Sequence, residues 1–135
     1  MKLLAIKYRE AQLYAHAAHN LTSGQSFFSD HEFFGELYST YESAYDSIIE
    51  RMIGLGFKVS PLEFSRIAAV NANDRTIKSP EDMFKNIKAL EEDIDDTIAM
   101  YLDDEESTTP GVRNLLEGLA DESEIRQYKI NQRLS

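Results

Sequence analysis

Apolar residues recur every three or four positions through four long segments of this chain, and no segment alternates apolar with polar residues as strands do. This spacing predicts four long helices, over residues 3–20, 29–54, 79–102 and 109–128, and the start signal Ser60-Pro61-Leu62-Glu63 predicts a short helix over residues 60–70. The 135 residues are about one domain's worth, so we expect a single domain over residues 1–135. The predicted fold is all-α: four long helices form a bundle, and the short helix lies in the crossover between the second and third long helices.

Local signals predict where some of these helices begin, bend and end. Ser29, followed by Glu32 three residues later, has the pattern of a capping box at the start of the second long helix. Gly54 and Gly56 predict the end of that helix, because glycine adopts a left-handed backbone at little cost. In the last helix the polar residues 121–124 interrupt the apolar spacing, and we expect a bend there.

The composition excludes several classes of protein. The chain has no cysteine, which rules out disulfides, thiolate metal sites and cysteine nucleophiles, and fits a reducing compartment. No apolar run approaches the roughly 20 residues that a membrane-spanning helix needs. The opening stretch MKLLAIKYRE has too short an apolar segment for a signal peptide. We therefore expect a cytoplasmic protein with no membrane partner.

Negative charge is concentrated in the second half of the chain. The formal net charge is −10, and the stretch from Glu91 to Glu124 holds thirteen acidic residues against one basic residue, Arg113. Such a block attracts cations and repels nucleic acid, so we expect no binding to DNA. A solvated helix face is the ordinary explanation for any single acidic residue in it.

Four side chains suited to binding a metal lie in the first half of the chain: His19, His31, Asp46 and Glu50. Imidazole and carboxylate groups together bind Fe(II), Mn(II) or Zn(II). Asp46 and Glu50 lie one turn apart on one face of the second long helix. The same helix begins near His31, and its fifteen-residue rise to Asp46 is about 22 Å, so the two cannot meet within one chain.

Two copies of this helix, antiparallel across a two-fold axis, would bring the histidines of one copy to the carboxylates of the other. The apolar surface of residues 29–54 is wider than a single stripe, which suggests burial against a partner as well as against its own bundle. The pattern predicts an isologous dimer with two symmetry-related metal sites at its interface. A plain helical bundle in which the same four residues form interface salt bridges is the alternative without metal.

Three stretches of this sequence resemble the Dps family, the mini-ferritins of the ferritin-like superfamily: His16-Ala-Ala-His19-Asn20, Gly24-x-x-Phe27-Phe28-x-x-His31-Glu32, and Asp46-x-x-x-Glu50-Arg51. The resemblance implies a ferritin-like four-helix bundle and a hollow shell of twelve subunits built from two-fold dimers. It also implies a ferroxidase that uses hydrogen peroxide or oxygen to oxidise Fe(II), stores ferric mineral and protects against oxidative damage. By position, His19 and His31 would come from one subunit, and Asp46 and Glu50 from its two-fold mate, as the catalytic and metal-binding residues. Zn(II) or Mn(II) would fit the same ligands.

The chain departs from the family at two positions. Asn20 stands where the family usually has tryptophan, and Gly35 where it often has aspartate. The missing carboxylate weakens one of two iron positions. An alternative is therefore a Dps-like shell or interaction protein whose divalent metal is structural and turns over little.

Other polar residues have secondary roles in this interpretation. His16 is expected beside the metal ligands rather than on the metal, and Arg51 in a salt bridge between subunits. Four acidic residues are candidates for lining pores or the inner surface of the shell: Glu42, Asp121, Glu122 and Glu124. The chain contains no Glu-x-x-His motif, so a di-iron site inside the bundle is not expected.

Overall fold

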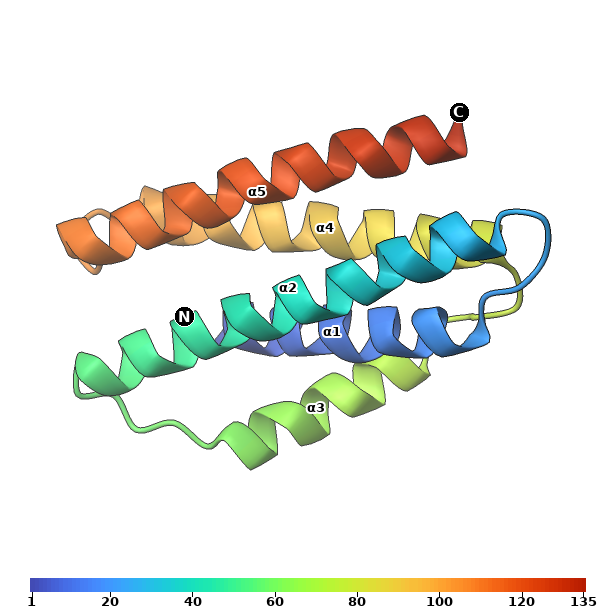
Figure 1. Cartoon of the computed structure of the whole chain (residues 1–135). Helices are drawn as coiled ribbons and strands as arrows, with labels where there is room; N and C mark the ends of the chain where they lie inside the picture. Colours follow the sequence, from blue (N-terminus) through green and yellow to red (C-terminus); the bar gives the residue numbers. More distant parts are fainter.

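The computed structural model describes all residues from 1 to 135 and contains helices but no strands (Figure 1). The helices are α1 (Lys2–Leu21), α2 (Phe27–Gly54), α3 (Pro61–Asn73), α4 (Pro80–Asp103) and α5 (Pro110–Leu134). The four long helices form a bundle, and the short α3 lies in the connection between α2 and α4. The predicted all-α bundle with a crossover helix is confirmed.

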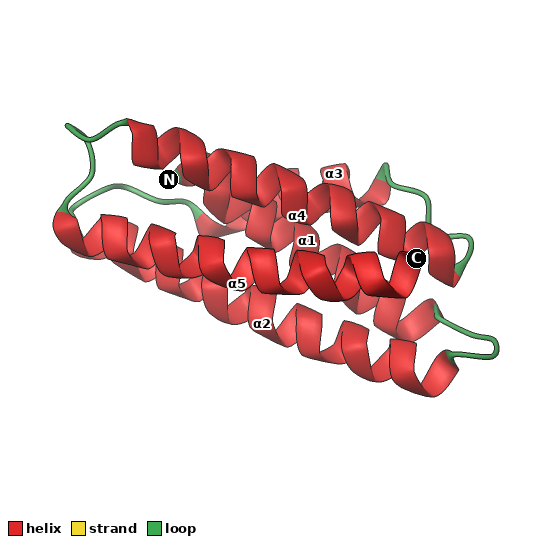
Figure 2. Ribbon diagram, turned by 90° about the horizontal axis from the view of Figure 1, so that it is seen from above, coloured by secondary structure: helices red, strands yellow, loops and turns green.

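Helix α1 is the central element of the bundle. It packs against α2, α3 and α4, while α5 packs on α4 (Figures 1 and 2). Ala11, Ala15 and Ala18 are fully buried along α1 at helical spacing. Because alanine projects only one carbon from the backbone, this line of residues lets neighbouring helices approach closely.

The two ends of α2 are set by different local structures. The helix begins at Phe27, so the predicted capping box at Ser29 is wrong; instead the Ser29 hydroxyl donates a hydrogen bond of 3.1 Å to the carbonyl of Ser26. At the other end the helix stops at Gly54, and Gly56 has a φ of +87°. That left-handed backbone is costly for other residues, so the predicted glycine end of α2 is confirmed.

Helix α5 runs without a break from Pro110 to Leu134, through the residues 121–124 at which the apolar spacing is interrupted. Polar residues continue the inner face of the helix there: Ser123 and Arg126 are buried against Glu91 of α4. The neighbouring Ile125 instead points outward and is 50% exposed. The prediction from apolar spacing failed here because part of the buried face of α5 is polar.

None of the five helices combines the length and the apolar composition that would let it cross a membrane.

Candidate metal centre

His19 and His31 lie side by side across the hairpin between α1 and α2. His19 is in the last turn of α1 and His31 in the first turns of α2. Gly24, with a φ of +97°, takes the left-handed conformation that this short connection requires. The two imidazole rings stack with centroids 3.8 Å apart and planes inclined by 19°.

The two histidines exchange hydrogen bonds with each other's backbone. Nδ1 of His19 is 2.8 Å from the carbonyl oxygen of His31, and Nδ1 of His31 is 2.8 Å from the carbonyl oxygen of His19. A carbonyl oxygen only accepts, so the proton of each neutral ring lies on Nδ1 and the lone pair on Nε2. Metal-binding histidines are commonly oriented in this way by a carbonyl behind the ring. The pair therefore has two Nε2 atoms with lone pairs available to a metal ion.

Gly35 leaves the room that the His19 ring occupies. A Cβ atom at Gly35 would lie 3.1 Å from Nδ1 and 3.2 Å from Cε1 of His19. The ring cannot easily retreat, because it is held by the stack with His31 and by the hydrogen bond to the His31 carbonyl. The absence of a side chain at this position is thus part of the packing of the histidine pair.

The Gly35→Ala substitution is expected to weaken binding of Co(II) or Zn(II) by about tenfold, because the new methyl group pushes the His19 ring off its carbonyl partner. Isothermal titration calorimetry of the purified protein measures this. Gly118→Ala is the matched control: it also lies inside a helix, but a Cβ there meets nothing within 4 Å. The control should keep its metal affinity and gain about 0.5–1 kcal/mol in helix stability. Equal metal affinities of the two variants would contradict the role of Gly35.

Aromatic rings enclose the histidine pair. Phe27 stacks on His31 with ring centroids 4.9 Å apart, and Tyr38 meets His19 edge-on at 5.3 Å. His16, one turn before His19, stacks on Tyr38 with ring centroids 4.2 Å apart, and its own ring centroid is 6.4 Å from that of His19. These ring contacts restrict the motion of both imidazoles.

An ion pair between the buried Asp30 and the partly exposed Arg133 anchors the start of α2. The Asp30 carboxylate accepts hydrogen bonds from Nε and Nη2 of Arg133 at 3.1 and 3.0 Å, which joins the first turn of α2 to the last turn of α5. The hydrogen bonds to Asp30 raise the pKa of Arg133 above its ordinary value. Because His31 follows Asp30 directly, this bidentate pair also limits the movement of His31.

The two predicted carboxylate ligands lie in the other half of α2. Asp46 and Glu50 are both exposed, one turn apart, and about 22 Å along the helix separates His31 from Asp46. Within one chain no three His, Asp or Glu side chains come together in a way that would hold a metal ion. One chain thus brings together two of the four predicted residues and leaves the other two apart from them.

The centre of the bundle contains a polar cluster that the sequence analysis missed. Glu91 of α4 is fully buried and accepts hydrogen bonds from Arg126 Nε at 2.5 Å, the Tyr41 hydroxyl at 2.5 Å and the Ser123 hydroxyl at 2.7 Å. Burial and the charge of Glu91 raise the pKa of Tyr41. Burial by itself would lower the pKa of Arg126. The charge of Glu91 and its hydrogen bond to Arg126 together have the larger effect, so the pKa of Arg126 is raised. A guanidinium already neutralises this carboxylate, so the cluster offers no site for a metal.

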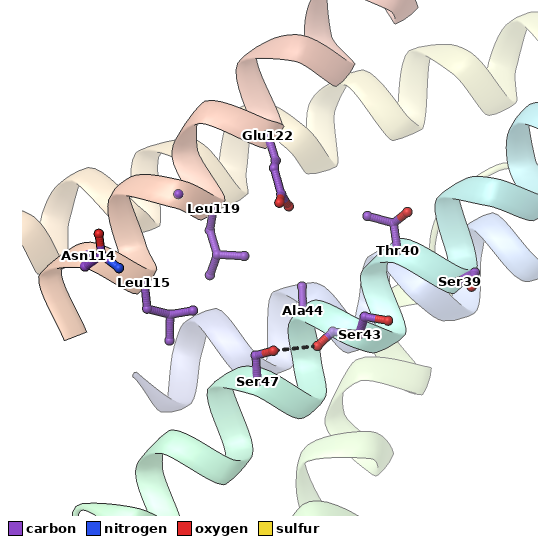
Figure 3. Close-up of a pocket in the computed structure, with 10 residues that line it drawn as sticks. Ser39, Thr40, Ser43, Ala44, Ser47, Asn114, Leu115, Leu119 and Glu122 are labelled. Atoms are coloured by element: carbon purple, nitrogen blue, oxygen red, sulfur yellow. Dashed lines mark hydrogen bonds between the residues drawn. The ribbon is translucent and has the colours of Figure 1, made fainter. Parts of the chain in front are cut away.

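A groove of about 490 Å³ separates α2 from α5, and Figure 3 shows the residues that line it. Hydroxyl groups of α2 form one wall, from Ser39, Thr40, Ser43 and Ser47. Glu122 of α5 points into the groove from the other side. It is the only carboxylate there, so the groove lacks the ligands for a second metal centre.

A family model for the ferritin-like domain matches residues 2–135, which is nearly the whole chain. Comparison with curated proteins gives no match. Ferritin-like proteins bind or store iron, commonly oxidise it, and usually assemble as oligomers. The matched range covers all four long helices and the crossover helix of this chain. This chain belongs to the ferritin-like family.

Proposed function

We propose that this protein is a mini-ferritin of the Dps type, which oxidises Fe(II) and stores the product as ferric mineral inside a shell of twelve subunits. The family accounts for iron as the substrate. The observation that carries the proposal is the histidine pair, in which both Nδ1 atoms donate to backbone carbonyls and both Nε2 atoms keep a lone pair. Fixed neutral imidazoles of this kind suit a divalent iron substrate.

Each site is proposed to be shared by two subunits. His19 and His31 come from one subunit, and Asp46 and Glu50 from its two-fold mate. The length of α2 supports this, because the two pairs lie too far apart to act together in one chain. The exposed carboxylates make no ion pair of their own within the chain, so they are available to a partner.

The ligand set suits oxidation of the bound ion. Carboxylates stabilise Fe(III) more than Fe(II), which favours loss of an electron, and four protein ligands leave coordination positions for an oxidant. Hydrogen peroxide accepts two electrons and two protons and becomes two water molecules, so one peroxide oxidises two Fe(II) ions. Zn(II) and Mn(II) would bind to the same ligands, and Zn(II) would block the site because it has no redox chemistry.

Gly35 favours a second candidate function. Because no carboxylate stands one turn after His31, a second iron position lacks a ligand that the family often has. In this alternative the protein is a Dps-like shell whose metal holds two subunits together and turns over little.

The test compares iron oxidation in air with oxidation driven by peroxide, followed by the absorbance of ferric iron. We expect peroxide to accelerate oxidation and the iron to stay in solution, while the double variant His31→Ala, Asp46→Ala behaves as buffer alone. Glu36→Gln is the matched control, since Glu36 is also an exposed carboxylate of α2. If the protein binds metal tightly but oxidises Fe(II) no faster than buffer, the proposed ferroxidase activity is rejected and the alternative with a structural metal is supported.

A further inference from the structure

Arg133 lies in the last turn of α5, at the end of the bundle where α1 is connected to α2 (Figure 1). We propose that Arg133 is a positioning residue of the metal centre. Through Asp30 it holds the backbone of His31, and with it the orientation of both imidazole rings that offer Nε2 to a metal ion. The inference rests on the proposed function only for the metal, and the guanidinium acts through the histidines rather than on the metal.

The pair of Asp30 and Arg133 is the polar link between α2 and α5. No other hydrogen bond or ion pair joins the two helices, and a groove separates them farther along. Asp30 lies in the first turn of α2 and Arg133 in the last turn of α5, so each charge is at the helix end whose dipole it offsets. A bidentate guanidinium–carboxylate pair fixes orientation as well as distance. Helix α5 therefore sets how the first turn of α2 is rotated.

The residue that follows Asp30 takes part in both hydrogen bonds of the histidine pair. The carbonyl oxygen of His31 accepts from Nδ1 of His19, and Nδ1 of His31 donates to the carbonyl oxygen of His19. Both bonds are 2.8 Å long, so a rotation of the first turn of α2 would lengthen them or tilt them. A ring that loses its carbonyl partner can carry its proton on Nε2 instead, which is the atom that must keep a lone pair for the metal.

The side chain of Arg133 is held in place by the core. Its guanidinium carbon lies 4.6 Å from the centroid of the Phe84 ring. Phe84 in turn contacts the rings of Phe33 and Phe34, whose centroids are 5.7 and 4.8 Å away. The carboxylate that Arg133 binds is buried, since only 3% of the Asp30 side chain is exposed. These contacts restrict the guanidinium, so its position determines that of Asp30.

Replacing Arg133 by lysine keeps the charge and removes the bidentate geometry. Arg133→Lys is expected to bind Zn(II) about tenfold more weakly than the wild type in isothermal titration calorimetry, which is the lower end of the effect of partners behind metal ligands. Arg75→Lys is the matched control. Arg75 pairs with the buried Glu10 (Nε to Oε2, 2.8 Å), and Glu10 lies about 14 Å along α1 from His19. The control should keep the wild-type affinity. Equal affinities of the two variants, both weakened or both unchanged, would overturn the inference.

The protonation site of the imidazoles gives a second test, which needs no metal. Nitrogen NMR of isotope-labelled histidines should show the proton of His19 and His31 on Nδ1 in the wild type. In Arg133→Lys, whose fold circular dichroism checks, the His19 signals should move toward those of a ring protonated on Nε2. The signals of His16, which stacks on Tyr38, should stay the same. Unchanged His19 signals in the folded variant would reject the inference.

These measurements separate the role of Arg133 from the proposed function. If both variants behave as expected but the wild type oxidises no iron, the proposed function is rejected and the role of Arg133 stands. If the wild type oxidises iron and Arg133→Lys binds Zn(II) as tightly as the wild type, the role of Arg133 alone is rejected.

Discussion

Two inactive variants of this protein, mixed in equal amounts, are expected to regain roughly one quarter of the wild-type rate of Fe(II) oxidation. His19→Ala removes a proposed ligand from the histidine half of the site, and Asp46→Ala removes a proposed ligand from the carboxylate half. Each variant alone would have no complete site, because in the proposed function every site takes one half from each subunit. A dimer that contains one chain of each kind has one site with both defects and one site with none.

The expected recovery follows from random pairing. About half of the dimers in an equal mixture contain one chain of each kind, and each of these has one complete site out of two, which gives about a quarter of the sites. The chains are mixed unfolded and refolded together, and peroxide-driven oxidation is measured by ferric absorbance after subtraction of the rate in buffer.

A matched mixture separates this result from a general effect of refolding. His19→Ala mixed with His31→Ala should recover nothing, because both defects lie in the histidine half and every mixed dimer has two incomplete sites. Equal recovery in the two mixtures, or none in either, would contradict a site built from two subunits.

Much of the fold was predictable from the sequence, since the apolar spacing of the four long segments comes directly from the geometry of a helix with one buried side. The ends of α2 show where that reasoning is weaker. Its start was predicted at Ser29 from a pattern of side chains. The helix in fact begins at Phe27, and the Ser26 carbonyl accepts a hydrogen bond of 2.9 Å from the backbone N–H of Asp30. Several residues compete to cap a helix, and a sequence pattern alone does not decide among them.

The polar core of α5 escaped prediction for a different reason. From the sequence alone, Ser123 and Arg126 are expected at the surface, because a buried arginine is rare unless a carboxylate pairs with it. That partner, Glu91, lies 35 positions earlier on another helix. A glutamate in the middle of the apolar stripe of α4 was the only signal, and the acidic composition of the surrounding segment obscured it.

The histidine pair was partly predictable. His19 and His31 lie near the two ends of the short connection between α1 and α2, so their proximity follows from the hairpin. The exchange of hydrogen bonds between their Nδ1 atoms and the two carbonyls depends on ring orientations that a sequence does not specify. The same limit applies to Gly35, which the sequence marks only as a missing carboxylate. In the structure it is the space that the His19 ring requires.

Replacing Arg126 by methionine is expected to lower the free energy of unfolding by about 3–5 kcal/mol, because it leaves the fully buried carboxylate of Glu91 without its counter-charge. Urea unfolding followed by circular dichroism, at one fixed protein concentration, measures the loss. Lys7→Met is the control, since its ion pair with Asp93 lies partly in solvent and should contribute less than about 1 kcal/mol.

A double variant shows whether the loss comes from the unpaired charge rather than from the shape of the side chain. Glu91→Gln removes the charge but keeps a carbonyl oxygen that accepts from Tyr41 and Ser123. Combined with Arg126→Met, it should be less destabilised than either single variant, because neither partner is then left charged and alone. Additive losses in the double variant, or an Arg126→Met loss no larger than that of Lys7→Met, would mean that packing rather than charge pairing holds α4 and α5 together at the bundle centre.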